Sequence, residues 1–310
     1  MYTRTRLFVL ILVLGLASLA CSIIQEPPGS PTAPSAPPAA PTANGGAAIP
    51  TSDGPQPTNS PGPIPQMPSF AVILVAEDDV LNVRSGAGVS HEVIGTLGPQ
   101  SVGVKRTGKL QQVDGAAWVE VKLEAGGLGW VNARFLTEYV PPDQFCSDAQ
   151  VEDLIDKFVA AVQTQDGTAL ADLVSPTHGL TLRHEWWNPE VHYPKAVVPG
   201  IFTDTQARDW GVQDGSGRPI RGAFKDVALP WMQDVFSSDF ERHCNDIERG
   251  SGGSAGYKLW PFEYGNINYV ALYRPAEVGD ELNWRTWAVG VEYVRGLPYI
   301  AFLVQYHWEI

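Results

Sequence analysis

The sequence has little of several features that commonly reveal a function. Its 310 residues include three cysteines and three methionines, and lysine plus arginine total 21 against 34 aspartate plus glutamate. The net charge of −13, with no basic stripe, excludes the electrostatic footprint of a nucleic-acid-binding protein. An acidic surface is also repelled by anionic lipid head groups, so we expect no peripheral membrane patch in the folded part.

Familiar catalytic and metal-binding patterns are also missing. His178, His184 and His192 are spaced so that a strand through His184 does not bring the other two to its face, and the spacing predicts no zinc site. The Ser251–Ser254 segment lacks the strand-to-helix context of a nucleophile elbow. The sequence therefore predicts no metal and no cofactor, and it assigns no catalytic residue.

The first 21 residues have the layout of a secretory signal. Arg4 and Arg6 precede an apolar run over Leu7–Leu19, and a small residue stands before Cys21. The sequence Ala17-Ser18-Leu19-Ala20-Cys21 resembles the lipobox of bacterial lipoproteins, in which the cysteine is acylated and becomes the first mature residue. We therefore expect a signal peptide over residues 1–20 and lipidation at Cys21.

An alternative interpretation of the same run is an uncleaved anchor, since Leu7–Ile24 is 18 residues without a charge. Both interpretations place the rest of the chain outside the cytoplasm. We expect an exported lipoprotein on the outer side of the cytoplasmic membrane, or in the outer membrane where a cell has one. Cys21 acylation would attach it to the lipid bilayer.

Residues 21–66 form the predicted stalk. Of the 40 residues in 27–66, thirteen are proline, five are glycine and none is aromatic. Such a segment cannot bury enough apolar surface to offset its conformational entropy, so it is predicted to be disordered. Its proline content favours extended polyproline II, with a contour of roughly 120 Å at ~3.1 Å per residue.

Residues 67–144 contain short apolar segments separated by glycine, at a spacing of about ten residues that is typical of a small all-β barrel. The expected strands are 71–76, 93–97, 102–107, 117–122 and 128–132. The Leu81–Gly88 segment, L-N-V-R-S-G-A-G, resembles the opening of a bacterial SH3-like domain. Val93–Leu97, Trp118–Val121 and Gly129–Val131 follow in the order of that family's later strands.

The resemblance implies a binding module for cell-wall peptides. The candidate ligand-binding residues are the aromatic side chains Trp118, Trp130, Phe135 and Tyr139. The alternative for the two tryptophans is packing in the barrel core. The expected partner is peptidoglycan or an envelope peptide.

Residues 145–310 contain eight of the ten tryptophans and predict an α+β domain. Apolar residues from Val151 to Val162 fall on one helix face. A short second helix is expected over Ala169–Val174, and a third around Ala223–Phe236. The C-terminal segments 269–273, 284–294 and 299–308 predict an antiparallel sheet that follows the helices. This order resembles the cystatin-like cone of nuclear-transport-factor-like proteins.

A closer resemblance covers residues 170–310. Asp209-Trp210-Gly211, Asp214–Ile220 and Trp284-Arg285 look like an uncharacterised domain of exported bacterial lipoproteins. The pattern ends in H-x-x-W-T-I, where this chain has Gln305-Tyr306-His307-Trp308-Glu309-Ile310. The resemblance implies a domain and names no reaction.

Polar and aromatic residues within these motifs are the candidates for a ligand site. The set is Asp209, Trp210, Asp214, Ser216, Glu292, Gln305, His307 and Glu309. Asp214–Gly217 is also the pattern of a tight turn, in which Asp and Ser bond to local backbone. Glu292, Glu309 and Asp209 could act as acid–base carboxylates if the fold brings them into one cavity.

Cys146 and Cys244 are the remaining cysteines, and an even pair in an oxidising compartment predicts a disulfide. Two reduced, buried thiols are the alternative.

Three functions remain open from the sequence. The first is a surface protein with a wall-binding barrel and a ligand- or partner-binding C-terminal domain. The second is a cell-wall or glycan hydrolase with its active site in residues 145–310. The third is a non-catalytic docking or sensory accessory of the envelope. Convergent titratable groups would favour the hydrolase, whereas an exposed apolar patch would favour docking.

Overall fold

The computed structural model describes residues 68–247 and 260–308. They belong to one compact unit of the chain, residues 61–310. The predicted signal peptide, Cys21, the whole predicted stalk, the Ser251–Ser254 segment and Glu309 lie outside the described residues. Within the described ranges, no helix has the length and apolar character needed to cross a membrane.

The first part is a small barrel whose strands run in the order β3-β2-β6-β5-β4. Its elements are β2 (Leu81–Arg84), β3 (Val93–Leu97), β4 (Lys105–Val113), β5 (Ala116–Lys122), β6 (Leu128–Asn132) and the 3₁₀ helix η1 (Ala133–Phe135). Alternation along the strands sends Val83, Val119 and Val131 into the core, where each is fully buried. The predicted strand around 102–107 begins later and is longer, because β4 continues to a tight turn at Asp114-Gly115, where both φ angles are positive.

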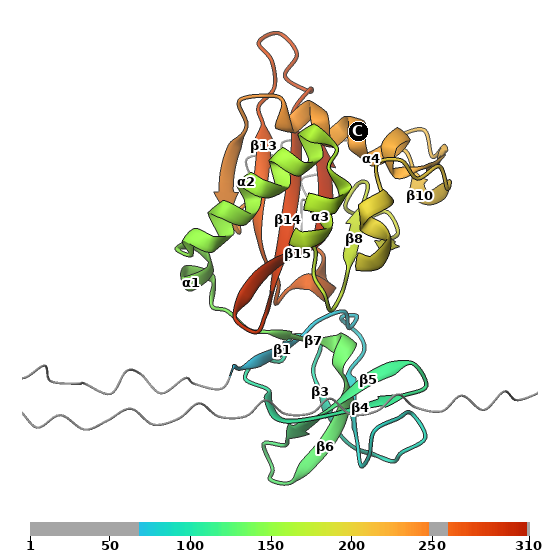
Figure 1. The fold of residues 1–310 in the computed structure, drawn as a ribbon, viewed down its shortest axis with the longest axis vertical. Coiled ribbons are helices and arrows are strands. Elements are labelled where there is room, and N and C mark those ends of the chain that lie inside the picture. The colour runs from blue at the N-terminus through green and yellow to red at the C-terminus, as the bar shows by residue number, and fades with distance from the viewer. Residues whose placement is uncertain (1–67, 248–259, 309–310) are drawn as a thin grey trace, which may run out of the picture. The chain divides into compact units, whose positions relative to one another are not determined.

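The second part is built on an eight-stranded sheet in which β9, β8, β15, β14 and β13 are neighbours and β12 forms one edge (Figure 1). Six of its eight strands are β8 (Leu180–Arg183), β9 (Val191–Tyr193), β12 (Glu241–Cys244), β13 (Asn268–Arg274), β14 (Arg285–Val294) and β15 (Leu297–His307). The turn Arg295-Gly296 joins β14 to β15 as expected, with φ angles of 55° and 75°.

Helices and a hairpin cover this sheet. They are α1 (Pro142–Cys146), α2 (Ala149–Thr164), α3 (Gly167–Leu173), α4 (Phe224–Phe236), the 3₁₀ segments η2 (Lys195–Gly200) and η4 (Phe262–Tyr264), and the hairpin β10 (Arg208–Val212) with β11 (Pro219–Gly222). In Figure 1, α2 crosses one face of β13, β14 and β15. The predicted apolar face of α2 is buried in the main core, from Val151 to Val162.

The expectation of helices followed by an antiparallel sheet is wrong in its order. Strands β8 to β11 precede α4, and β15 pairs with β8 in parallel. A parallel pair needs a long crossover, and the segment from β8 to β15 contains α4. The result is a mostly β structure, with a curled sheet and helices inserted between its strands.

The sheet continues into the segments that flank the barrel in sequence. Strand β1 (Phe70–Val72) pairs with β7 (Leu136–Glu138), and Glu138 of β7 is paired with Tyr293 of β14. The Glu138 carboxylate also accepts hydrogen bonds from the backbone N–H groups of Arg295 and Gly296, at 2.7 and 2.8 Å. The β14–β15 turn is therefore held by a residue that directly follows the barrel.

The disulfide predicted from the cysteine count is confirmed. Cys146 at the end of α1 is bonded to Cys244 at the end of β12, with a Cα–Cα distance of 5.7 Å. Their sequence separation of 98 residues means that the bond closes a long loop and restricts the unfolded chain.

Candidate functional site

A groove of about 400 Å³ lies on the barrel. The residues that line it are Leu74, Val75, Ala76, Asp79, Val80, Leu81, Asn82, Arg84, Val89, Trp118, Asn132 and Phe135. Most of its length is apolar, with one carboxylate, one guanidinium and two amides. A concave apolar surface with a few polar groups is the usual form of a ligand site.

The L-N-V-R segment forms one wall of this groove. In β2 the side chains of Leu81 and Val83 are buried, whereas Asn82 is exposed. Arg84 is held in place because its guanidinium donates a hydrogen bond to the carbonyl of His91 at 2.7 Å. Because side chains alternate along the strand, Leu81 and Val83 pack in the core while Asn82 and Arg84 line the groove.

Two of the four aromatic residues predicted to bind ligand line the groove, namely Trp118 and Phe135. Trp118 is almost fully buried and packs with Trp130 and Ala87 in a small cluster of its own. Trp130 and Tyr139 do not line the groove. Trp118 therefore both fills the barrel and contributes to the groove wall.

The sequence reasoning missed the two valines at the groove. Val80 and Val89 are 42% and 71% exposed, which is unusual for aliphatic side chains in a folded domain. Both occur in the segments that flank β2. An apolar residue in a polar loop was the available signal, but a single sequence does not show which loop valines are exposed.

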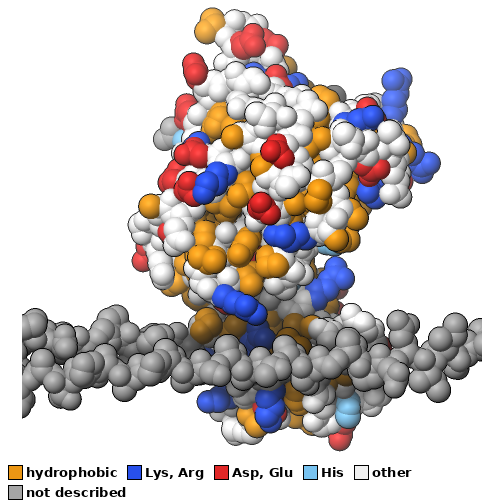
Figure 2. Space-filling view, viewed as in Figure 1, with side chains coloured by type: hydrophobic (Ala, Val, Ile, Leu, Met, Phe, Trp, Pro, Cys, Tyr) orange, Lys and Arg blue, Asp and Glu red, His pale blue; other side chains and the backbone are white. Residues whose placement is uncertain are grey.

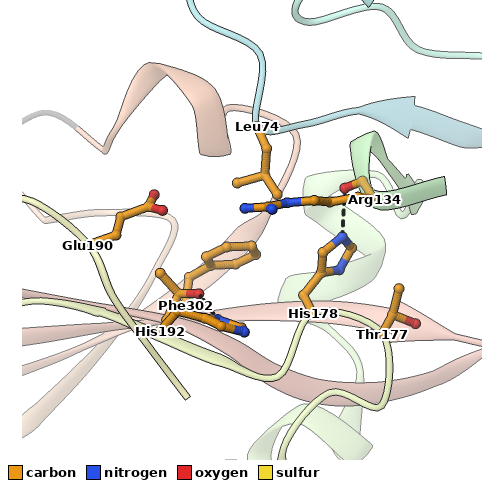
Figure 3. A pocket seen from close by; sticks show the side chains of 8 residues that line it. Leu74, Arg134, Thr177, His178, Glu190, His192 and Phe302 are labelled. Carbon is orange, nitrogen blue, oxygen red and sulfur yellow. Dashed lines mark hydrogen bonds between the residues drawn. The ribbon is translucent and has the colours of Figure 1, made fainter. Parts of the chain in front are cut away.

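A second, smaller cavity of about 150 Å³ lies beside η1. Figure 3 shows the side chains that line it, among them Arg134, His178, Glu190 and His192. Leu74 lines this cavity as well as the groove. The two hollows are therefore adjacent, and one leucine side chain contributes to both.

His178 lies at the base of the second cavity in a fully bonded cluster. Its Nδ1 is 2.6 Å from Oε2 of Glu292, and its Nε2 is 2.8 Å from the backbone carbonyl oxygen of Arg134. A carboxylate and a carbonyl oxygen are both acceptors, so this geometry favours an imidazole that carries a proton on each ring nitrogen. Burial opposes that charge, but the hydrogen bond and negative charge of Glu292 outweigh it and raise the pKa of His178.

Ser175 completes the cluster. Its hydroxyl donates to Oε1 of Glu292, and its Oγ accepts from the backbone N–H groups of Thr177 and His178 at 3.0 and 2.9 Å. In a serine hydrolase the imidazole lies between the carboxylate and the serine hydroxyl. Here the hydroxyl contacts the carboxylate directly and the second ring nitrogen contacts a carbonyl, so this trio does not activate a nucleophile.

The open side of the cavity is electropositive. Figure 3 shows the Arg134 guanidinium extending into it, and no ion-pair partner of this group lies among the described residues. Burial, and then the positive charge of Arg134, lower the pKa of His192. Glu190 is the nearby carboxylate, but it already accepts hydrogen bonds from Arg183 and Tyr264. This side of the cavity is suited to a small anion such as a carboxylate.

The other predicted site residues do not converge. Asp209 is exposed on β10 and forms an ion pair with Arg221 at 3.3 Å. Trp210 is fully buried and donates to the carbonyl of Gly222 at 3.0 Å. Asp214 and Ser216 lie in the turn between β10 and β11, where the hydroxyl of Ser216 contacts Oε1 of Gln213 at 3.1 Å.

Three further candidates lie on or next to the last two strands. Glu292 belongs to the His178 cluster, and Gln305 is fully buried beside Trp287, its partner in the β14–β15 register. His307 is half-buried, with its Nε2 3.3 Å from Oε1 of Glu185. Glu292 and Gln305 are buried in the sheet, whereas Asp209 is exposed on the β10–β11 hairpin and paired with Arg221. The structure therefore does not bring together Glu292 and Asp209, two of the three carboxylates considered for acid–base chemistry, and the third, Glu309, lies outside the described residues.

Figure 2 shows acidic and basic side chains interspersed on the face that it presents. Among the described residues, no group of three or more histidine, cysteine, aspartate or glutamate side chains has an arrangement that could hold a metal ion. His178 and His192 do share the second cavity, whereas His184 lines a different one.

Comparison with known families identifies residues 79–137 as a bacterial SH3 domain. Over 175 residues the chain is 23% identical to the teichoic acids export ATP-binding protein TagH of Bacillus cereus. That match covers 54% of this chain and 30% of the relative, so the chain spans less than a third of the relative's length. No solved structure matches the chain significantly.

Proposed function

We propose that the protein is a cell-envelope protein whose bacterial SH3 domain binds a peptide of the cell wall in the groove at Trp118 and Phe135. The observation that carries the proposal is the position of that 400 Å³ groove, which is walled by the L-N-V-R segment of the matched domain. Exposed valines on the groove wall favour an apolar partner, since contact between such side chains and water is unfavourable.

The adjacent cavity would add a binding site for a negatively charged group of the peptide. Cell-wall stem peptides carry free carboxylates, and Arg134 offers a guanidinium that no described carboxylate neutralises. The groove would hold the apolar part of the peptide, and Arg134 with His192 would hold a carboxylate. Leu74, which lines both the groove and the cavity, would contact the peptide where it passes from one to the other.

We further propose that the chain is exported and tethered through Cys21, with residues 1–20 as the signal peptide and 21–66 as the stalk. The bacterial SH3 domain matched at residues 79–137 is consistent with an extracellular or envelope location. A partial likeness to a teichoic acids export protein agrees with a role in the envelope. A lipid at Cys21 would then fix one end of a protein that reaches toward the wall.

For residues 145–310 we infer a cystatin-like cone that binds a ligand or partner. The supporting observation is the strand order β9-β8-β15-β14-β13-β12 with one parallel pair, which curls around α2. Fold likeness does not specify a reaction, and the Ser175–His178–Glu292 geometry gives no support to hydrolysis. Binding is therefore favoured over catalysis for this domain.

The test is co-sedimentation of the chain, without its signal peptide, with purified peptidoglycan sacculi. Val80→Ser and Val89→Ser remove apolar groove surface at exposed positions, so the fold should be retained. Together they should lower the bound fraction several-fold, and Arg134→Ala should lower it for sacculi with free stem carboxylates but not for amidated sacculi.

The matched control is Val102→Ser, an exposed barrel valine outside the groove. It should bind like the parent chain. If the parent chain sediments no more than a non-binding protein does, or if the groove variants bind as well as Val102→Ser, the proposed function is wrong.

A further inference from the structure

A cavity of about 220 Å³ lies at the end of β8, between the β10–β11 hairpin and the first turns of α4. The proposed peptide groove does not include it. Its walls combine the apolar side chains of Ile220, Val227 and Trp231 with the polar side chains of His184, Glu185 and Asp226.

Two of these polar side chains are buried without complete hydrogen bonding. His184 and Glu185 are each 4% exposed. The Nδ1 atom of His184 and the Oε2 atom of Glu185 have no hydrogen-bond partner among the described residues. Buried polar atoms are nearly always paired, so two unpaired atoms on neighbouring residues at one cavity indicate a missing partner.

The backbone at this point is held in an unfavourable conformation. Glu185 has φ of 75°, a left-handed geometry that residues with a Cβ rarely adopt. Strain of this kind concentrates at binding and active sites.

Asn188 keeps that conformation in place. Its amide donates to the carbonyls of His184 and Val212 at 2.8 and 2.9 Å, and its Oδ1 accepts from the N–H of Val212 at 3.0 Å. The chain can approach so closely because residue 211 is glycine, where a Cβ would lie 2.2 Å from Oδ1 of Asn188. This explains the Trp210-Gly211 part of the motif as a support for the segment that carries Glu185.

The charges of the cavity favour a cation. Glu185 and Asp226 are its carboxylates, and within the part of the chain that the structure describes only Oε1 of Glu185 has a charged partner, His307 at 3.3 Å. Burial, and then electrostatic repulsion from His307, lower the pKa of His184 to about 4, so its imidazole is neutral at physiological pH. Arg285, which lies 4.2 Å from the centre of the Trp231 ring, is paired with Asp234.

We propose that this cavity binds a primary alkylammonium group, such as the end of a lysine-type side chain. The ammonium would donate to the free Oε2 of Glu185 and to a carboxylate oxygen of Asp226, and its third hydrogen would face the neutral imidazole of His184. The aliphatic chain would pack on Ile220, Val227 and the Trp231 ring. Carboxylates with an aromatic face are a recurrent setting for bound ammonium groups.

The experiment is an NMR titration of the ¹⁵N-labelled chain with n-butylammonium chloride, followed through the amide signals of Val227 and the side-chain N–H of Trp231. n-Butanol and sodium butyrate are the matched neutral and anionic probes. Butylammonium should shift these signals in a saturable way, and the other two probes should bind at least tenfold more weakly.

Glu185→Gly separates a binding role from a structural one. Glycine relieves the left-handed strain and removes the unpaired carboxylate oxygen, so the melting temperature should rise while butylammonium affinity falls at least tenfold. The control is Gln165→Gly at the C-cap of α2, where φ is 55°. It should raise the melting temperature without changing affinity.

Asp226→Asn, at an exposed position on α4, should weaken butylammonium binding several-fold in a chain that remains folded. The proposal is overturned if butanol shifts the same signals as strongly as the amine, or if Glu185→Gly and Asp226→Asn both keep the parent affinity. Because peptide binding by the barrel does not involve this cavity, either proposal can fail alone.

Discussion

His178 precedes β8 in the sequence and His184 follows it, and both side chains are buried. Around His178 every ring nitrogen has a partner, and Ser175 and Glu292 are bonded in turn. Around His184 the Nδ1 atom has no hydrogen-bond partner among the described residues, nor has one carboxylate oxygen of Glu185, whose backbone is left-handed. The pKa of the first histidine is raised and that of the second is lowered.

The contrast indicates two different roles for buried polar side chains, one in stability and one in ligand binding. A complete network contributes to one defined structure, because removing any member leaves another unpaired. An incomplete network lowers the stability of the fold, because its buried polar atoms have lost water without gaining a partner. Folding alone does not explain why such a network is kept. We therefore assign the His178 cluster to holding η1 against the sheet, and the His184 region to a ligand.

The largest expected effect comes from breaking the complete network. Glu292→Leu leaves the His178 ring and the Ser175 hydroxyl without their acceptor, and it should lower the free energy of unfolding by about 3–5 kcal/mol. Glu292→Gln should cost less, since a neutral imidazole can accept a hydrogen bond from the new amide. Urea denaturation followed by fluorescence measures both.

Glu281→Leu, at an exposed loop position, is the matched carboxylate control and should change stability by no more than about 0.5 kcal/mol. A Glu292→Leu variant as stable as this control would show that the His178 cluster contributes nothing to the fold, and the contrast with His184 would disappear.

Much of the architecture could be predicted from the sequence because it depends on local pattern. The expected strands 93–97, 102–107, 117–122 and 128–132 correspond to β3 to β6, and the buried face of α2 follows from helical periodicity. The segment 71–76, expected in the barrel, contributes only to β1 of the eight-stranded sheet, and β2 was not among the expected strands. The parallel β8–β15 pair could not be predicted, since strands joined by a long crossover leave no mark on the spacing of either one. The continuation of the sheet into β7 was hidden for the same reason.

The candidate sites were harder to predict. Glu292 was identified as a carboxylate of interest, but its partners Ser175 and His178 precede it by 117 and 114 residues. Its third link is to Arg134, through the cationic His178 and a backbone carbonyl that no side-chain pattern reveals. Glu185 was not singled out, because neither its positive φ nor its unpaired oxygen can be inferred from residue type.

The second-largest change in stability is expected at Gln305, which, like His184 and Glu185, has buried polar atoms without hydrogen-bond partners among the described residues. This side chain is fully buried, and neither its Oε1 nor its Nε2 has a partner among the described residues. Gln305→Leu removes both unpaired atoms with little change in volume, and it should raise the free energy of unfolding by about 1–3 kcal/mol. Thermal and urea unfolding would check the gain.

Val304→Leu, the preceding buried residue on the same strand, is the control for added apolar volume and should be neutral or destabilising. If Gln305→Leu is itself destabilising, the amide has a partner in solution and Gln305 belongs with the complete networks.

The smallest expected effect is a change of stability with pH. Raising the pH removes one proton from His178 but leaves all the side chains of its cluster in place. The pKa of His178 is raised in the folded protein, so its contribution to stability is fully present below the unfolded value of about 6.5. It is lost as the pH rises through the folded pKa, because the folded state then no longer holds an extra proton. His184, with its pKa near 4, adds no slope above pH ~6.5.

Urea denaturation at a series of pH values above ~6.5 should therefore show the parent chain losing stability more steeply than Glu292→Gln. In that variant the anion that raises the pKa of His178 is gone, so burial, which lowers the pKa, is opposed only by the hydrogen bond to the Arg134 carbonyl. His91→Ala, which removes an exposed histidine of the barrel, should keep the parent slope. Equal slopes for the parent chain and Glu292→Gln would mean that His178 is neutral in the folded state, and one of its two ring-nitrogen contacts would then lack a proton.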